Sequence, residues 1–160
     1  MDAGLCREHF AELINEELAL LQQLYAMLEE ERGVIASGDL AALQRSTERR
    51  QARVAALAHT EAQRHSLCRM HGQAADAPGI ERLLKWCDPA GQLAPRLRDC
   101  RERALKCRQL NDRNGLMVTA HLKRVEERLR ALRGRTDRSA TYGPRGDLVA
   151  AGSGRALGRG

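Results

Sequence analysis

A helical stripe between residues 97 and 132 constrains the fold of this chain more than any other sequence feature. Steps of three and four residues place these side chains on one helix face: Leu97, Cys100, Ala104, Cys107, Asn111, Asn114, Val118, Leu122, Val125, Leu129 and Leu132. The stripe is apolar at both ends and carries two asparagines in its middle. Asn114 and Gly115 form a pair that usually marks a turn, but the register continues through them. We therefore expect one unbroken helix over residues 93–133.

Asn111 and Asn114 have two interpretations. They are either buried polar residues that fix the register and the partner helix, as in coiled coils, or they hydrogen-bond an incoming backbone near Gly115. The two roles are compatible if a partner helix shares the groove. A glycine inside a helix costs about 1 kcal/mol relative to alanine, so we expect the chain to gain from a bare backbone at Gly115.

The rest of the chain also has helical patterns. Hydrophobic residues make up 42% of the sequence but aromatic residues only 2%, so the apolar mass is mostly leucine and alanine. Gly38 suits the left-handed position that closes one helix, and Asp39 can cap the next. Pro78 and Gly79 indicate a loop. The predicted helices cover residues 2–35, 40–69, 80–87 and 93–133. The sequence thus predicts an all-α fold, an elongated antiparallel bundle of three long helices plus a short helix with coiled-coil-like packing.

The last part of the chain differs in character. Residues 133–160 hold seven of the fourteen glycines and six arginines, against Asp137 and Asp147. Because the formal net charge is +6 and this segment has a surplus of four, residues 1–132 carry only about +2. We expect a helical bundle domain at residues 1–132 and a flexible Gly/Arg-rich basic tail at residues 133–160.

The chain has no sequence feature of secretion or membrane insertion. Charged residues follow Met1 where a signal peptide would need an apolar run. The longest uncharged helical stretch, residues 18–28, is 11 residues long, and a bilayer span needs roughly 20. Five cysteines form no close pair. We expect a cytoplasmic protein with reduced thiols and no membrane insertion.

The sequence contains no recognised catalytic or metal-binding motif. A glycine-rich phosphate loop, Gly-x-Ser-x-Gly, His-Glu-x-x-His and Cys-x-x-Cys are all absent from the sequence. Cys100 and Cys107 share a helix face, and small core side chains explain them better than metal ligands. His59, His65 and His71 rotate around a helix and cannot converge. We expect no enzyme activity, no cofactor, no metal and no small-molecule substrate.

Tyr142 is the only aromatic residue after residue 132 and stands next to Gly143. A tyrosine flanked by glycine and proline can anchor a flexible basic segment to a partner, because tyrosine binds with little loss of entropy. The alternative is an inert tail residue.

Three motifs in the second half of the chain are distinctive: Leu110-Asn111-Asp112-Arg113-Asn114-Gly115, Leu129-Arg130-Ala131-Leu132-Arg133-Gly134 and Thr141-Tyr142-Gly143-Pro144-Arg145-Gly146. A further one lies in the first half, Leu28-Glu29-Glu30-Glu31-Arg32 followed by Gly38-Asp39-Leu40. In these motifs the chain resembles the FlgN-type flagellar export chaperones, and residues 69–92 match only loosely. The resemblance implies a bacterial cytoplasmic chaperone that keeps hook-associated (hook–filament junction) flagellar proteins from premature assembly and delivers them to the flagellar type III export apparatus.

The expected mechanism is capture of a helical terminal segment of the cargo in a groove. Two alternatives remain open: a nucleic-acid-binding helical protein with a basic tail, which lacks interleaved aromatic residues, and a self-associating coiled-coil scaffold. The residues expected to bind a partner are Asn111, Asn114, Gly115, Val118, Leu122, Val125, Leu129, Leu132, Tyr142 and Gly143.

Overall fold

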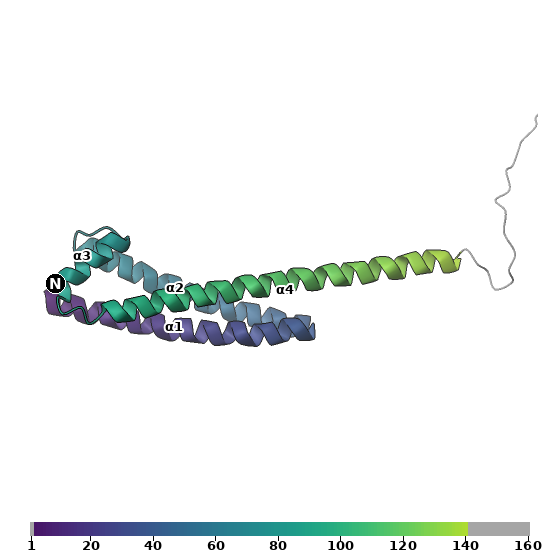
Figure 1. Ribbon diagram of the computed structural model, residues 1–160, viewed down its shortest axis with the longest axis horizontal. Helices are drawn as coiled ribbons and strands as arrows, with labels where there is room; N and C mark the ends of the chain where they lie inside the picture. Colours follow the sequence, from purple (N-terminus) through teal and green to yellow (C-terminus); the bar gives the residue numbers. More distant parts are fainter. Residues whose placement is uncertain (1, 141–160) are drawn as a thin grey trace, which may run out of the picture. The chain divides into compact units, whose positions relative to one another are not determined.

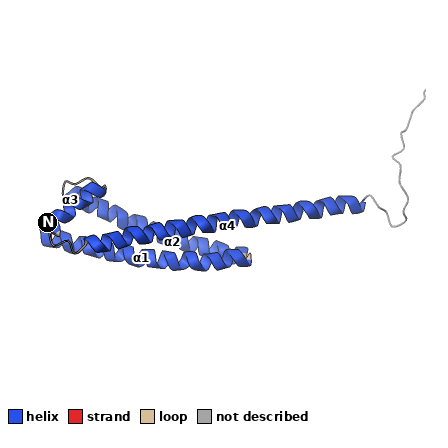
Figure 2. Ribbon diagram, in the orientation of Figure 1, coloured by secondary structure: helices blue, strands red, loops and turns tan. Residues whose placement is uncertain are grey.

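The computed structural model describes residues 2–140, with side chains as far as residue 134. These residues form four helices and no strand (Figures 1 and 2), which confirms the predicted all-α fold. The helices are α1 (Ala3–Ser37), α2 (Leu40–Met70), α3 (Ala77–Cys87) and α4 (Ala94–Ala140). The chain divides between His121 and Leu122 into two compact units, which we describe separately. No helix within residues 2–140 combines the length and the apolarity that a bilayer crossing requires.

The first two helices form an antiparallel hairpin, as expected from the short break between them (Figure 1). Gly38 has φ of 74° and its N–H donates to Ile35 O, while the Asp39 carboxylate accepts from Ala42 N at 2.9 Å. Ion pairs between Arg64 and Glu17 and between Arg50 and Glu31 join the two helices at two points along the hairpin. The predicted helix-closing glycine and capping aspartate are therefore confirmed.

The short helix α3 begins three residues before its predicted start. Its N-cap is Asp76, whose carboxylate accepts from Gly79 N at 2.8 Å, and Pro78 lies in the first turn. Proline is tolerated there because the first-turn N–H groups have no partner inside the helix. A Cβ at Gly79 would lie 1.9 Å from Ala74 O, so glycine is needed for this close approach. The expectation that Pro78 and Gly79 form a loop was wrong.

Side chains from α1, α3 and α4 supply most of the hydrophobic core of the first unit. The alanine-rich α2 contributes only three buried residues, Thr60, Leu67 and Cys68. The core also includes these buried side chains: Cys6, Phe10, Leu13, Ile14, Leu21, Leu24, Leu28, Ile80, Leu83, Leu84, Cys87, Leu93, Leu97, Cys100, Cys107 and Leu110. The core is thus built almost entirely from aliphatic side chains and thiols, with Phe10 as its fully buried aromatic ring.

Within the first unit, α4 runs parallel to α1 and is joined to it by a ladder of side-chain hydrogen bonds. Cys100 Sγ donates to Ile14 O at 3.7 Å, and Cys107 Sγ donates to Leu21 O at 3.5 Å. One heptad further, Asn114 Nδ2 donates to Leu28 O at 2.9 Å. Each pair is separated by 86 residues, so the two helices keep a seven-residue repeat in register. This regular repeat is the coiled-coil-like packing that the stripe predicts.

The last helix is longer than its sequence pattern indicates. It was expected to end near residue 133, but it continues to Ala140 with Gly134 inside it. A glycine in a helix costs about 1 kcal/mol without ending it, and a Cβ at Gly134 would meet no atom within 4 Å. In the second unit, the described residues are the α4 segment from Leu122 to Ala140.

Candidate functional site

Four of the predicted partner-binding residues line one groove in the first unit. The groove has a volume of about 360 Å³ and lies between α1, α2 and α4. Its lining residues are Glu31, Ile35, Leu43, Thr47, Arg50, Asn111, Asn114, Gly115 and Val118. We call it the Asn114 groove. The structure therefore brings together residues from three helices around the motif that the sequence singled out.

A hydrogen-bonded network at this groove connects all three long helices. Arg50 of α2 donates through Nε to Glu31 Oε1 at 3.3 Å and through Nη1 to Asn111 Oδ1 at 3.1 Å. Asn114 Nδ2 donates to Glu31 Oε2 at 3.1 Å and to Leu28 O at 2.9 Å. Glu31 and Asn114 are each 3% exposed, so the network reaches from the rim into the core. A buried carboxylate requires such partners, because an unpaired charge in the interior is costly.

The two asparagines have different environments, which corrects part of the predicted stripe. Asn114 is buried, but Asn111 and Ala104 are exposed, and Leu110 takes the core position beside Asn111. A seven-residue repeat winds slowly around a straight helix, so the buried face moves to an adjacent residue along α4. Asn114 thus bonds to α1 inside the bundle, while Asn111 accepts from Arg50 at the rim of the Asn114 groove.

Gly115 stands in the middle of α4 with open space beside it. A Cβ at this position would meet no atom within 4 Å, so no neighbouring helix requires a glycine here. Its carbonyl oxygen accepts from Thr119 Oγ1 at 3.1 Å. The bare backbone that the sequence points to is therefore not explained by packing within the described part of the chain.

The apolar stripe of the second unit is exposed. Leu122 is 54% exposed, Val125 40%, Leu129 48% and Leu132 59%. Intervals of three and four residues place these side chains on one face of the helical segment. We call them the α4 stripe. Tyr142 and Gly143, the remaining predicted partner-binding residues, lie outside the described residues.

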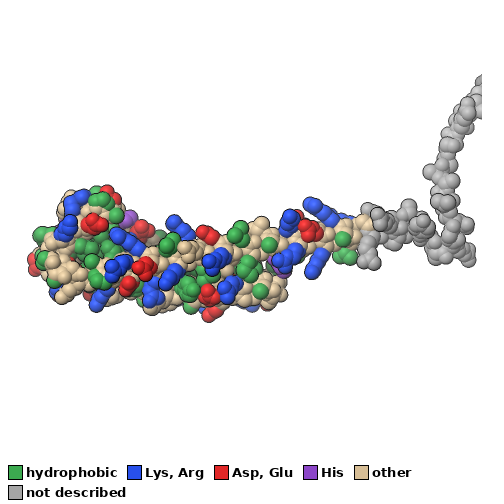
Figure 3. Space-filling view, viewed as in Figure 1, with side chains coloured by type: hydrophobic (Ala, Val, Ile, Leu, Met, Phe, Trp, Pro, Cys, Tyr) green, Lys and Arg blue, Asp and Glu red, His purple; other side chains and the backbone are tan. Residues whose placement is uncertain are grey.

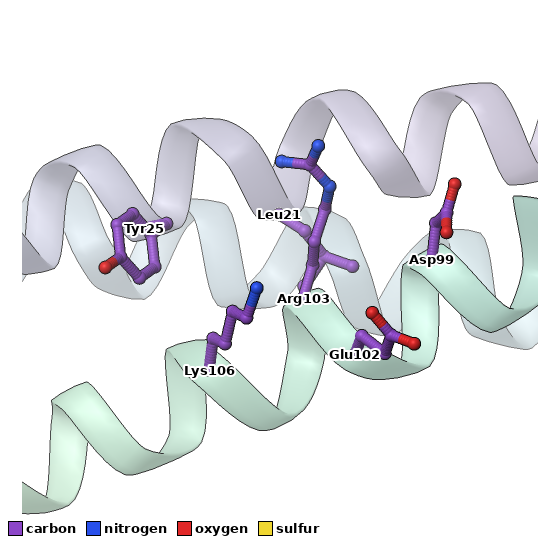
Figure 4. Close-up of a pocket in the computed structure, with 6 residues that line it drawn as sticks. All are labelled: Leu21, Tyr25, Asp99, Glu102, Arg103 and Lys106. Carbon is purple, nitrogen blue, oxygen red and sulfur yellow. The ribbon is translucent and has the colours of Figure 1, made fainter.

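A further groove, between α1 and α4 of the first unit, was not found from the sequence (Figure 4). It has a volume of about 430 Å³ and is lined by Leu21, Tyr25, Asp99, Glu102, Arg103 and Lys106. Figure 4 shows Arg103 extending from α4 toward α1, with the two acidic side chains on the same helix. Two acids and two bases balance in charge, and none of these side chains has a buried polar atom without a partner. The sequence feature that could have indicated this groove is Tyr25, an aromatic residue that the structure leaves 41% exposed.

Charged side chains are mixed over the surface. On the face shown in Figure 3, Lys and Arg side chains recur along the described chain among acidic and apolar ones. This pattern is that of a solvated helical surface. Within residues 2–134, the aromatic residues Phe10, Tyr25 and Trp86 are far apart in the sequence, unlike the interleaved aromatic residues that bind single-stranded nucleic acid.

All five cysteines are buried and free. Burial raises the pKa of the Cys6 thiol and of the Cys100 thiol to about 12, and it also raises the pKa of Cys68, Cys87 and Cys107. Cys100 and Cys107 are core residues, as expected. Because the thiolate is the metal ligand and the nucleophile, these protonated thiols are poor candidates for either role. Among the side chains of residues 2–134, no three from His, Cys, Asp or Glu gather in a way that could hold a metal ion.

The fold and these sites define an all-α bundle protein with a polar groove and an exposed apolar helix face. Comparison with protein families matches residues 6–150 to the family described as FlgN protein, and the chain belongs to this family. No curated protein and no solved structure matches the chain. Membership supports a flagellar chaperone role in broad terms, in agreement with the resemblance noted from the sequence motifs.

Proposed function

We propose that this protein is a cytoplasmic chaperone for hook-associated flagellar proteins, the subunits of the hook–filament junction. It keeps these subunits from premature assembly and delivers them to the flagellar type III export apparatus. Family membership supports the general role. The choice of cargo rests on the motifs around Asn114 and Tyr142 that resemble the family.

The observation that carries the proposal is the exposure of the α4 stripe. Its four aliphatic side chains, 40–59% exposed, form an apolar face on a helix that otherwise carries many charges. An amphipathic helix of the cargo can cover such a face, with contacts repeating every three or four residues. Burying the exposed halves of four such side chains contributes roughly 3–6 kcal/mol before the costs of association. The apolar side chains of the cargo helix that are buried in the same contact contribute a similar amount, so the two contributions together are comparable with the cost of association and the capture is expected to be reversible.

The test is calorimetric titration of the full chain with a purified hook-associated protein from the same flagellar system. The variants Val125→Asp and Leu129→Asp place a charge in the α4 stripe, and we expect each to weaken binding at least about tenfold, or 1.4 kcal/mol. Leu105→Asp is the matched control, because Leu105 is also on α4 and is 54% exposed, but lies in the first unit. Unchanged affinity in the two stripe variants, with helical content preserved by circular dichroism, would contradict the proposal.

Tyr142 and Gly143 belong to the proposal on sequence grounds. We propose that Tyr142 contacts the cargo or the export apparatus, because tyrosine adds contact area at low entropic cost. The control for any Tyr142 variant is Tyr142→Phe, which keeps the ring and removes the hydroxyl group.

A further inference from the structure

The Asn114 groove is lined by both apolar and polar side chains. Its apolar lining side chains are Ile35, Leu43 and Val118, and its polar ones include Glu31, Arg50, Asn111 and Asn114. Such a combination fits a side chain with an apolar stem and a polar head. The groove lies wholly within the first unit, apart from the α4 stripe.

The amide of Asn114 leaves one buried acceptor without a donor. Its Nδ2 donates to Leu28 O and to Glu31 Oε2. Both partners are acceptors, so the amide nitrogen must face them and the two ends of the amide cannot be exchanged. Asn114 Oδ1 is buried and has no hydrogen-bond partner among the described residues. A buried acceptor without a hydrogen bond is destabilising, so a donor that reaches Asn114 Oδ1 would be favourable.

The charge of the groove indicates which kind of donor it accepts. Glu31 is paired with Arg50, so the buried carboxylate is already neutralised. A cationic head group would compete with Arg50, and an anionic one would face Glu31. A neutral group is favoured, with an N–H for Asn114 Oδ1 and an acceptor for the guanidinium of Arg50. A carboxamide provides both.

Gly115 allows a partner to approach the Asn114 groove. It is next to Asn114 on α4, it lines the groove, and a side chain there would point into open space. A bound helix can therefore approach the α4 backbone closely at this point. Asn114 Oδ1 itself is covered, so its donor arrives when a rim side chain moves. The exposed hydrogen bond between Arg50 and Asn111 is the part of the network that opens with the smallest loss.

We propose that the Asn114 groove binds a carboxamide side chain, Asn or Gln, carried by a helical segment of the cargo. The amide N–H of the cargo donates to Asn114 Oδ1, its carbonyl oxygen accepts from Arg50, and its backbone lies against Gly115. The partner's identity rests on the proposed function, whereas the carboxamide class rests on the geometry of this groove. The groove thus adds a specificity contact to the apolar capture by the α4 stripe.

The first test blocks the groove without disturbing the fold. Gly115→Leu fills the open space, and Gly33→Leu is the matched control, because Gly33 also lies within a long helix, α1, and a Cβ there would meet no atom within 4 Å. In titrations of the full chain with a purified hook-associated protein, we expect Gly115→Leu to weaken binding at least about tenfold and Gly33→Leu to leave it within about twofold. Equal affinities of the two variants would overturn the proposal.

The second test identifies the chemical group. Each Asn and Gln of the cargo's helical terminal segment is replaced by Leu in a synthetic peptide, and each peptide is titrated into the wild-type chain and into Asn114→Ala. We expect one replacement to weaken binding to the wild type about tenfold and to have no effect on Asn114→Ala. Replacements that act equally on both proteins would overturn the carboxamide assignment. If Asn114→Ala does not fold, the Gly115→Leu comparison decides.

These experiments distinguish failure of the carboxamide-groove proposal from failure of the proposed chaperone function. Loss of binding in Val125→Asp with normal binding in Gly115→Leu would reject the groove and keep the chaperone function. If no variant binds differently from the wild type, both are rejected. If sedimentation of the chain without cargo shows a dimer that Gly115→Leu dissociates, the occupant is a second copy of the chain and the groove proposal is overturned.

Discussion

The different roles of Asn111 and Asn114 can be tested by removing each side chain in turn. Asn114→Ala removes a hydrogen bond to the buried Glu31 carboxylate and another to Leu28 O. Hydrogen bonds to charged groups contribute about 1.5–3 kcal/mol and neutral ones about 0.5–1.5 kcal/mol. The same substitution also removes the unpaired acceptor Asn114 Oδ1, which increases the free energy of unfolding by about 1–3 kcal/mol. At the middle of these ranges, the expected net loss in the free energy of unfolding is about 1.3 kcal/mol.

Asn111→Ala is the matched control. Asn111 is exposed and its Oδ1 accepts one hydrogen bond from Arg50. Its removal should cost no more than about 0.5 kcal/mol, as for most surface substitutions. Both variants replace asparagine by alanine in the same helix, so the gain in helix propensity cancels in their difference.

The measurement is urea unfolding followed by far-ultraviolet circular dichroism. We expect Asn114→Ala to be less stable than Asn111→Ala by about 1 kcal/mol or more, with the same dependence on urea concentration in both. Equal free energies of unfolding, or a less stable Asn111→Ala, would refute the assignment of Asn114 to the core and of Asn111 to the rim.

Four further predictions follow from particular contacts. Gly115→Ala and Gly33→Ala should each stabilise the protein by up to about 1 kcal/mol in thermal unfolding, because neither new methyl group meets another atom; a destabilised variant would show that its position is packed. Asp39→Ala should cost about 1 kcal/mol by loss of the cap on Ala42 N, whereas the exposed mid-helix Asp112→Ala should change the urea midpoint little. The free energy of unfolding should fall as pH rises from about 9 toward 12, because the pKa of a thiol is 9.0 in the unfolded chain and about 12 for the folded Cys6 and Cys100, so the unfolded chain binds fewer protons in this range. Cys100→Ala should make this fall smaller, and an unchanged dependence of the unfolding free energy on pH would contradict the prediction. Tyr142→Ala should impair motility and export of hook-associated proteins while Tyr142→Phe does not, and unimpaired export would remove the role proposed for the ring.

Much of the fold follows from local sequence signals. The Gly38–Asp39 break and the helical periodicities predict the four helices, because helix ends and apolar faces depend on residues close together in the chain. The start of α3 was missed because Pro78 is compatible with both a loop and a first helical turn. The end of α4 was missed because glycine weakens a helix without stopping it.

The candidate site was only partly predictable. The motif around Asn114 and Gly115 stands out in the sequence, but the identity of the buried asparagine depends on a slow drift of the helix face that spacing does not resolve. The network through Glu31 and Arg50 joins residues 19 to 83 positions apart. Such contacts depend on how the helices pair in space, and no local pattern reports them. The exposure of the α4 stripe is likewise a property of tertiary packing.

The central claim, that the α4 stripe captures a helical segment of a hook-associated protein, is tested most directly by hydrogen exchange. Backbone amide exchange of the full chain is measured with and without a purified hook-associated protein from the same flagellar system. We predict slower exchange over residues 122–132 in the complex, since a bound helix removes the stripe from solvent and stabilises this segment. Binding that leaves the exchange of residues 122–132 unchanged, while another region becomes protected, would contradict the account.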